Sequence, residues 1–376
     1  IVTKDLPTRE EFNVSTGIGY NGDFHFNDQF QTFDSGGRPL GFADSDHDLP
    51  FNNDISNLNP ITNNQELRQL TQQLQPQMNS QTTTSFLDSN FGFSWGNQYN
   101  LNEDATWRMG TMAAVSYRNE TEYYENYIDG QVFRRSQDNT ILELEADRTN
   151  QGQLSTNNVL LTGLGGLTVK GERNKFKLTL LHIQNGDTQS SFFNQRNIIL
   201  NSNLSERTAL LYTERSISNI LLNGTHSDAE NNWNVDWKGA VTWANVNEQD
   251  FRVSPFLVNE ENGIRSISPS ESGDPLRIWR NLEEINLVGK LDISRKHELF
   301  GHDAKFKIGG AYVFKNRDFG VDQYALPNAD FNEEFSQRFD GDPDAILAPE
   351  NILTENPRQG TFVRQDSNPS DSFDSD

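Results

Sequence analysis

The sequence contains no cysteine among its 376 residues. Disulfide bonds, thiolate catalysis, iron–sulfur clusters and zinc–thiolate sites are therefore excluded. Basic residues are also few, because 31 Lys and Arg stand against 54 Asp and Glu and leave a net charge of −23. Binding to a phosphate backbone requires clustered Lys and Arg, so this balance argues against nucleic acid as a partner.

Apolar residues are scarce as well. They make up 34% of the chain, and the mean hydropathy of −0.74 is low for a soluble fold that must bury a large core. No apolar run approaches the roughly 18 residues of a membrane helix. Aromatic residues nevertheless reach 11%, which is unlike a disordered chain. A wide β-barrel reconciles these features, since its lumen and loops are polar and only alternate strand residues face lipid.

Strict alternation of side-chain polarity is the clearest pattern in the sequence. From Trp233 to Trp243 the odd positions are apolar, aromatic or glycine, and the even positions are polar or small. A period of two is typical of a β-strand. The same pattern occurs at 91–96, 107–118, 284–293 and 305–315. With less regular stretches included, we expect nine strands, at about 11–27, 85–99, 106–119, 153–170, 175–185, 208–225, 232–248, 281–293 and 303–316.

The connections between these strands alternate in length. Four are short and polar, at 100–105, 170–174, 226–232 and 294–302, and four are long, at 28–85, 119–152, 186–208 and 249–280. Short turns at one end and long loops at the other are typical of an outer-membrane barrel. Within the first long connection, Leu67, Leu70 and Leu74 predict a short surface helix over Asn63–Leu74, with Thr62 or Asn63 as its N-cap. We interpret residues 317–376 as a truncated acidic extracellular loop.

Aromatic residues gather near the predicted turns and the predicted outer rim. Trp and Tyr prefer the membrane–water interface, so we expect a membrane girdle formed by Trp95, Tyr99, Trp107 and Trp233. The alternative is the core of a soluble β-sandwich. A second group is expected at the outer rim, where it serves either as the upper girdle or as a weak ligand-stacking surface. This group comprises Tyr123, Tyr124 and Tyr127.

One acidic segment invites a metal interpretation. Asp44, Asp46 and Asp48 place carboxylates at alternate positions, in a way similar to the start of a calcium-binding loop. The glycine and distal glutamate of an EF-hand are missing, so the segment is either a solvated acidic loop or the site of a structural calcium. We expect no other cofactor and no catalytic residue, since the sequence carries no hydrolase, kinase or dinucleotide motif.

Several runs resemble a known family. Residues 6–21 resemble the first barrel strand of Bacteroidota-type TonB-dependent receptors, which directly follows the plug domain in that family. Residues 60–67 resemble the family's first extracellular loop, and residues 212–226 resemble a strand that descends to a periplasmic turn. The resemblance spans most of residues 1–316. It implies a 22-stranded barrel in the bacterial outer membrane, preceded by a plug and a TonB box.

This chain carries neither plug nor TonB box, and nine strands with an unpaired last strand do not close a barrel. We therefore expect a barrel fragment. The resemblance implies energy-coupled uptake of a siderophore, glycan, peptide or vitamin, without enzymatic activity. It implies as partners the TonB complex acting through the missing plug, outer-membrane lipid, and a surface lipoprotein lid.

Two other classes compete with this interpretation. A secreted or surface β-rich adhesin would share the acidic, cysteine-free composition, but it predicts long connections at both ends of the sheet and no aromatic girdle. A smaller barrel enzyme, such as an outer-membrane lipase or protease, would require a Ser/His/Asp-type set aimed from adjacent strands, and the sequence presents no convincing set.

Overall fold

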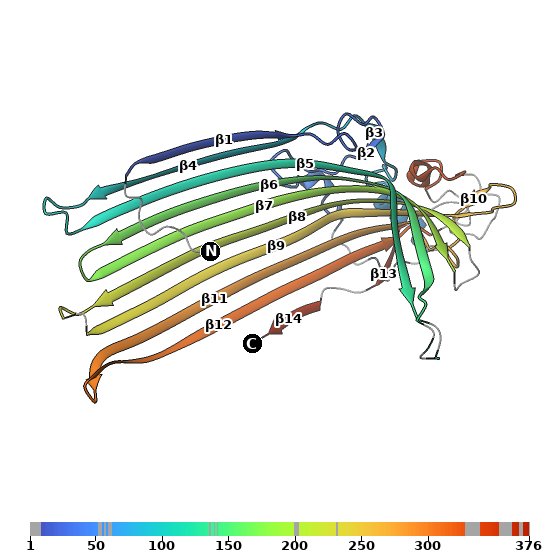
Figure 1. Ribbon diagram of the computed structural model, residues 1–376. Coiled ribbons are helices and arrows are strands. Elements are labelled where there is room, and N and C mark those ends of the chain that lie inside the picture. The colour runs from blue at the N-terminus through green and yellow to red at the C-terminus, as the bar shows by residue number, and fades with distance from the viewer. Residues whose placement is uncertain are drawn as a thin grey trace.

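The computed structural model describes residues 9–51, 55, 58, 62–134, 137–138, 140, 142–198, 203–230, 232–327, 339–352, 363–367 and 371–375. Its main element is one large antiparallel sheet, shown in Figure 1. Within the described residues, nine long strands form this sheet, and each pairs with the next along the chain. They are β1 (Glu11–Gly19), β4 (Asp88–Asn100), β5 (Arg108–Phe133), β6 (Glu145–Lys170), β7 (Asn174–Asn197), β8 (Leu204–Ser227), β9 (Trp233–Val258), β11 (Leu276–Leu299) and β12 (His302–Ala325).

Smaller elements attach to this sheet. β10 (Arg265–Ser266) pairs with β9, and both β13 (Arg364–Ser367) and β14 (Asp371–Ser375) pair with β12. β2 (Phe30–Thr32) and β3 (Gln81–Thr83) form a separate two-stranded sheet. The helical elements are η1 (Ser45–His47), α1 (Asn64–Thr71) and η2 (Pro343–Leu347). None of the helices in the described part of the chain is long and apolar enough to cross a membrane.

The expected antiparallel β-architecture is confirmed, and each of the nine predicted segments contains a strand of the sheet. The predicted bounds were wrong in several places. β5 to β9, β11 and β12 are each 24 to 26 residues long, so much of the predicted loops 119–152, 186–208 and 249–280 is strand. In these segments the hydrogen bonds between strands continue, although polar side chains lie on both faces of the sheet. The sequence there no longer alternates between apolar and polar residues, so it does not indicate a strand.

Two further expectations need correction. The first strand ends at Gly19 instead of 27, and it is followed by turns in which Phe26 adopts a left-handed φ of 59°. The tail is more than a loop, because it continues β12 to Ala325 and adds η2, β13 and β14. The predicted helix is confirmed as α1 with Asn63 at its N-cap, although it ends at Thr71 and its leucines are buried. Residues 6–8 and 60–61 of the family-like runs lie outside the described residues.

The sheet has two unlike ends. The short connections 101–107, 171–173, 228–232 and 300–301 lie together at one end, which we call the turn end. The connections at the opposite end, the loop end, are 20–87, 134–144, 198–203 and 259–275, and all but 198–203 are longer than the turns (Figure 1). The predicted asymmetry is therefore present, although the predicted long loop at 186–208 is reduced to the short connection 198–203.

The sheet also has two unlike faces. Register partners share a face, and one row crosses all nine strands through Phe12, Trp95, Ala113, Gly165, Leu180, Ile220, Val241, Leu287 and Phe314. We call this side the apolar face. The opposite side, the polar face, carries ion pairs such as Lys290–Asp292 at 3.1 Å and Lys315–Glu284 at 2.9 Å. The apolar positions of all five alternating sequence stretches fall on the apolar face.

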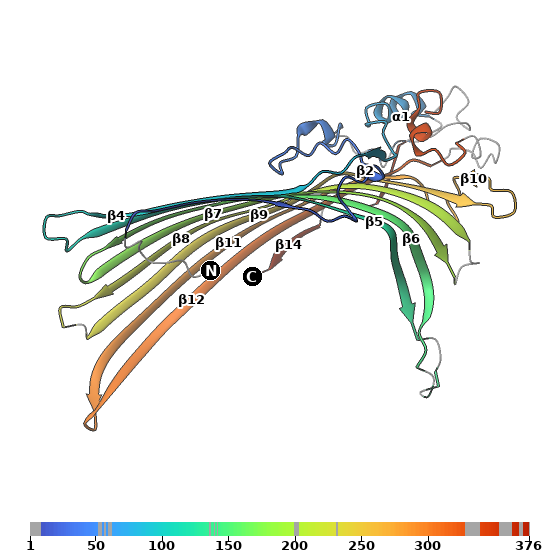
Figure 2. The same cartoon turned by 45° about the horizontal axis from the view of Figure 1, so that its top comes forward.

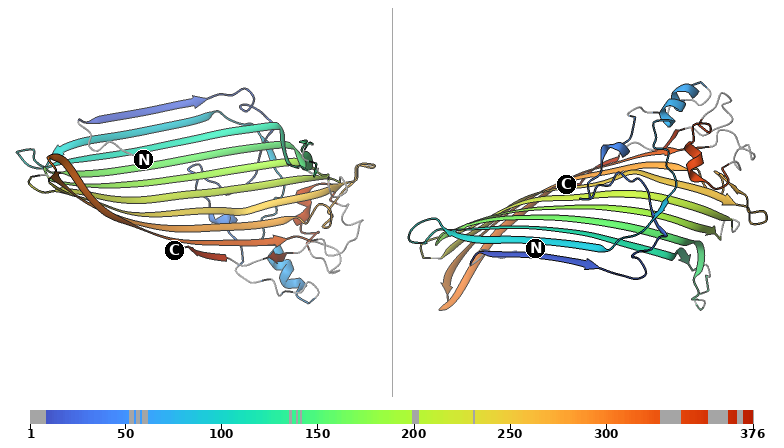
Figure 3. Two further views of the ribbon diagram at one scale, coloured as in Figure 1. Left: turned by 60° about the horizontal axis from the view of Figure 1, so that its bottom comes forward. Right: turned by 90° about the horizontal axis from the view of Figure 1, so that it is seen from above.

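The hydrophobic core lies at the loop end. There the described residues of 20–87 and 339–363, which we call the cap layer, cover the apolar face (Figure 2; Figure 3, right). Met78, Ile346 and Val363 of the cap layer pack with Phe256 and Trp279 of the sheet. At the turn end the apolar face is uncovered, and side chains such as Ile308 remain 61% exposed.

Candidate functional site

A buried ion-pair network fixes the cap layer to the sheet. Asp250 lies where the register of β9 shifts against both β8 and β11, and it has a left-handed φ of 54°. Such bulges re-aim side chains. The Asp250 carboxylate accepts hydrogen bonds from Arg252 Nε at 3.0 Å and from Arg277 Nε at 2.5 Å. All three side chains are at most 2% exposed.

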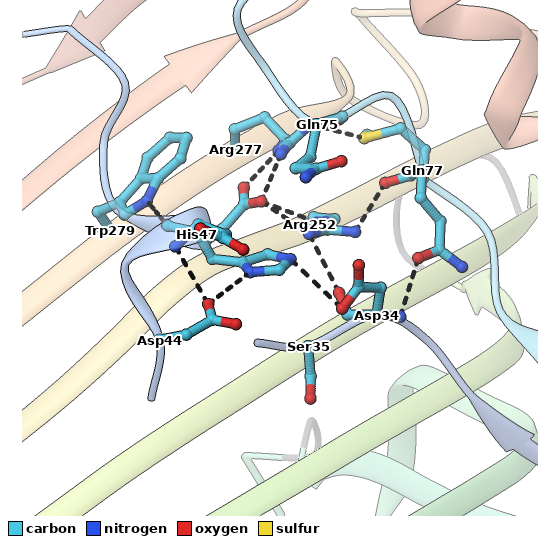
Figure 4. A network of polar contacts seen from close by, with 12 residues as sticks. Asp34, Ser35, Asp44, His47, Gln75, Gln77, Arg252, Arg277 and Trp279 are labelled. Atoms are coloured by element: carbon cyan, nitrogen blue, oxygen red, sulfur yellow. Dashed lines mark hydrogen bonds and ion pairs between the residues drawn. The ribbon is translucent and has the colours of Figure 1, made fainter. Parts of the chain in front are cut away.

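The same two arginines also bind the cap layer. Arg252 donates to the carbonyl oxygen of Gln77 at 3.0 Å, and Arg277 donates to the carbonyl oxygen of Gln75 at 2.6 Å. Figure 4 shows both guanidiniums directed at this segment. Burial alone would raise the pKa of Asp250, but the charges of Arg277 and Arg252 hold that pKa below its ordinary value. The carboxylate and both guanidiniums are therefore charged, and their hydrogen bonds hold the cap layer against the sheet.

The acidic segment 44–48, for which the sequence left a solvated loop and a calcium site open, lies beside this network. Asp44 faces Arg38 at 2.7 Å and His47 Nδ1 at 3.2 Å. Asp48 accepts a hydrogen bond from Gln249 at 2.5 Å, and the backbone oxygen of His47 accepts one from Trp279 at 2.9 Å.

The three predicted calcium ligands are thus not brought together, since Asp44 and Asp48 have separate partners and Asp46 is exposed. Among the described residues no group of three or more His, Asp or Glu is arranged to hold a metal ion. Of the three carboxylates, Asp48 contacts Gln249 of the sheet, whereas Asp44 is paired within the cap layer.

The predicted ligand-stacking tyrosines fall on opposite faces. Tyr123 lies on the apolar face under the cap layer and is 3% exposed. Tyr124 and Tyr127 lie on the polar face, on either side of a β-bulge in β5, with ring centroids 6.3 Å apart. Phe24 extends the series at 5.4 Å from Tyr124, and Phe193 extends it at 5.7 Å from Tyr127.

These four half-exposed rings, from Phe24 through Tyr124 and Tyr127 to Phe193, form what we call the aromatic string. Stacked and edge-on ring geometries at such distances suit sugar or aromatic ligands. The sequence identified its two tyrosines by their clustering. No local pattern signals Phe193, which the strand register brings beside Tyr127, or Phe24, which reaches Tyr124 from the turns after β1.

The predicted girdle residues share one location. Trp95, Tyr99, Trp107 and Trp233 all lie on the apolar face towards the turn end. Tyr99, Trp107 and Trp233 are 41%, 37% and 45% exposed. The Arg295 guanidinium lies 5.0 Å from the centre of the Trp233 ring, so this indole faces a wet, charged boundary on one side.

Comparison of the chain with family models, with curated proteins and with solved structures finds no match. The functional argument therefore rests on the arrangement of residues in this chain.

Proposed function

We propose that this chain forms part of the wall of an outer-membrane β-barrel that takes up a nutrient ligand, in the manner of a TonB-dependent receptor. The observation that carries the proposal is the row from Phe12 to Phe314, which stays apolar across nine strands and faces no layer formed by the described residues. An uncovered apolar surface of this extent requires an apolar partner. A band of about ten residues per strand beside the turn end suffices to cross a membrane.

Details of the uncovered face support a lipid environment. A groove of about 380 Å³ runs over Ala113, Gly163 and Gly165 and is bordered by Leu180 and Trp243. Small residues flanked by large apolar ones offer space for acyl chains. The half-exposed girdle aromatics near the turn end suit the boundary between hydrocarbon and water.

The polar face supports a water-filled lumen. Several of its charges are paired along or across strands, as where Lys290 of the same strand and Lys307 of β12 approach Asp292 at 3.1 and 3.2 Å. Ion pairs between strands stabilise a sheet face that contacts water, without an apolar core on that side. The chain's residues would then act as scaffold and ligand contacts, and TonB would act through a plug inside the barrel. A surface lipoprotein would meet the loop end.

The asymmetry of the connections favours this proposal over a surface adhesin. An adhesin sheet has no reason to confine its long connections to one end, or to place exposed Trp and Tyr at the other. The proposed barrel accounts for both features, because its inner turns are short and its outer loops are long.

Spin labels at two neighbouring positions test the proposal. Leu287 and Val288 are 39% and 38% exposed but lie on opposite faces of β11, and the chain has no native cysteine to interfere. We expect a label on Leu287→Cys in lipid vesicles to be accessible to oxygen and shielded from a water-soluble nickel chelate. A label on Val288→Cys should show the reverse. Equal chelate accessibility at both positions would refute membrane insertion.

A further inference from the structure

Two arginines on the polar face near the loop end have no polar partner in the part of the chain that the structure describes. Arg148 of β6 and Arg207 of β8 make no ion pair and no hydrogen bond with the described residues, and the Nε atom of each is buried without a partner. Other arginines of the loop end are paired, such as Arg265 with Glu206 at 2.5 Å and Arg196 with Glu260 at 2.7 Å.

The lack of a counter-ion is unexpected in this chain. Acidic residues outnumber basic ones by 23, so an acidic neighbour would be easy to supply. Burial and the nearby charge of Arg148 both lower the pKa of the Arg207 guanidinium. Two like charges with desolvated nitrogens are costly without an anion between them.

The strand register places Arg207 beside the aromatic string. Tyr127, Gly152, Phe193 and Arg207 form one row across β5 to β8 on the polar face. Gly152 has no side chain, which lets the Tyr127 and Phe193 rings meet above it at 5.7 Å. Figure 2 shows the loop ends of β5 and β6 curving away from the cap layer, as the β-bulges in β5 would promote.

We infer that Arg148 and Arg207 bind an oxyanion of a ring-bearing ligand whose rings stack along the aromatic string. Guanidinium groups bind carboxylate, sulfate and phosphate through paired charged hydrogen bonds. Four successive rings suit an oligomer of several ring units, and the ligand class that combines both features is an acidic oligosaccharide. The inference names a ligand class for the proposed importer and rests on that function for its biological role.

Isothermal titration of the full chain in detergent micelles tests the inference. The probe is trigalacturonic acid, its uncharged counterpart is the methyl ester, and inorganic phosphate tests the oxyanion without a ring. We expect Arg148→Gln and Arg207→Gln each to weaken binding of the acid by about 10-fold or more, as loss of a charge-assisted hydrogen bond implies. The control Arg196→Gln removes an exposed, paired arginine and should leave affinity within about 2-fold of the parent.

The ester should bind at least about 10-fold more weakly than the acid, since it cannot pair with the arginines. Tyr127→Ala should weaken the trisaccharide but leave phosphate binding unchanged. Failure of the parent chain to bind any of the anionic probes would overturn the inference. Equal affinity of the parent and the arginine variants would overturn it as well.

Thermal unfolding separates a binding role from a structural one. Without an anion, Arg207→Gln should unfold at the same temperature as the parent or higher, because the variant removes an uncompensated charge. Phosphate should raise the unfolding temperature of the parent but not that of the variant. A lower unfolding temperature for Arg207→Gln without anion would show that the arginine serves the fold. The spin-label experiment on Leu287 and Val288 tests the proposed function separately, so failure of one proposal can be told from failure of the other.

Discussion

Asp250 of β9 and Arg277 of β11 form an ion pair from which solvent is excluded, with side chains 2% and 0% exposed. The pair joins two strands of the sheet and, through Gln75, also joins the sheet to the cap layer. Removing one partner of such a pair leaves a buried charge with incomplete compensation, and that costs far more than loss of a surface pair. The cap layer should therefore depend on this contact more than on any surface salt bridge.

Arg277→Met should lower the free energy of unfolding by about 3–5 kcal/mol, the range for a broken buried ion pair. Chemical denaturation in micelles, followed by tryptophan fluorescence, measures the change. The control Arg196→Gln breaks the exposed pair with Glu260 and should cost under about 1 kcal/mol. Similar losses in the two variants would show that the network does not hold the cap layer.

The same network predicts a pH dependence. The pKa of Asp250 in the folded chain lies below its ordinary value of 3.8, so the stabilisation is complete above that value. As the pH falls below 3.8, the unfolded chain takes up the proton first, and stability declines until the folded-state pKa is reached. Acid titration of unfolding should show this decline in the parent. It should be weaker in Asp250→Asn, and identical slopes for both chains would contradict the prediction.

The two faces of β7 should respond differently to a charge. Leu180 lies on the apolar face, and its neighbour Leu181 lies on the polar face. If the apolar face meets lipid, Leu180→Arg should destabilise the folded chain in vesicles by about 2–4 kcal/mol. Leu181→Arg is the matched control and should cost under about 1 kcal/mol, because its guanidinium reaches water. Urea titration in phosphatidylcholine vesicles compares them, and equal costs would contradict the lipid assignment.

Gly152 should tolerate no side chain. A Cβ at this position would lie 2.0 Å from the backbone oxygen of Phe192, whereas one at Gly163 of the same strand would meet nothing within 4 Å. Gly152→Ala should therefore cost about 1–3 kcal/mol, and Gly163→Ala should change stability by less than about 0.5 kcal/mol. Denaturation in micelles provides the comparison. An unchanged free energy of unfolding for Gly152→Ala would show that β6 and β7 can move apart at this position without cost.

The part of the fold that sequence could predict is the part with one uncovered apolar face. Between Trp233 and Trp243 the residues on the apolar face are apolar or glycine and those on the polar face are polar or small, so the sequence alternates with a period of two. At the loop end the rule fails, because Arg252 and Arg277 occupy apolar-face positions and are buried by charge pairing under the cap layer. The bulge at Asp250 also shifts the phase of β9, and polarity there was interpreted as a loop.

The candidate site was predictable to a similar extent. Tyr124 and Tyr127 stand close in the sequence and drew notice as a cluster. Phe193 and Arg207 come from other strands and join them only through the register, which no local pattern specifies. The spacing of the aspartates at 44, 46 and 48 likewise gives no hint of the distant contact between Asp48 and Gln249.

We expect the attachment of Met78 to Asp344 to form late in folding. The backbone nitrogen of Met78 donates to the Asp344 carboxylate at 2.6 Å across 266 positions of sequence. The hairpins of the sheet close between chain neighbours and form early, whereas contacts of such separation form late. The leucines of α1 should therefore stay exposed to solvent until most of the chain has folded. During that time a chaperone that binds unfolded segments would protect them from aggregation.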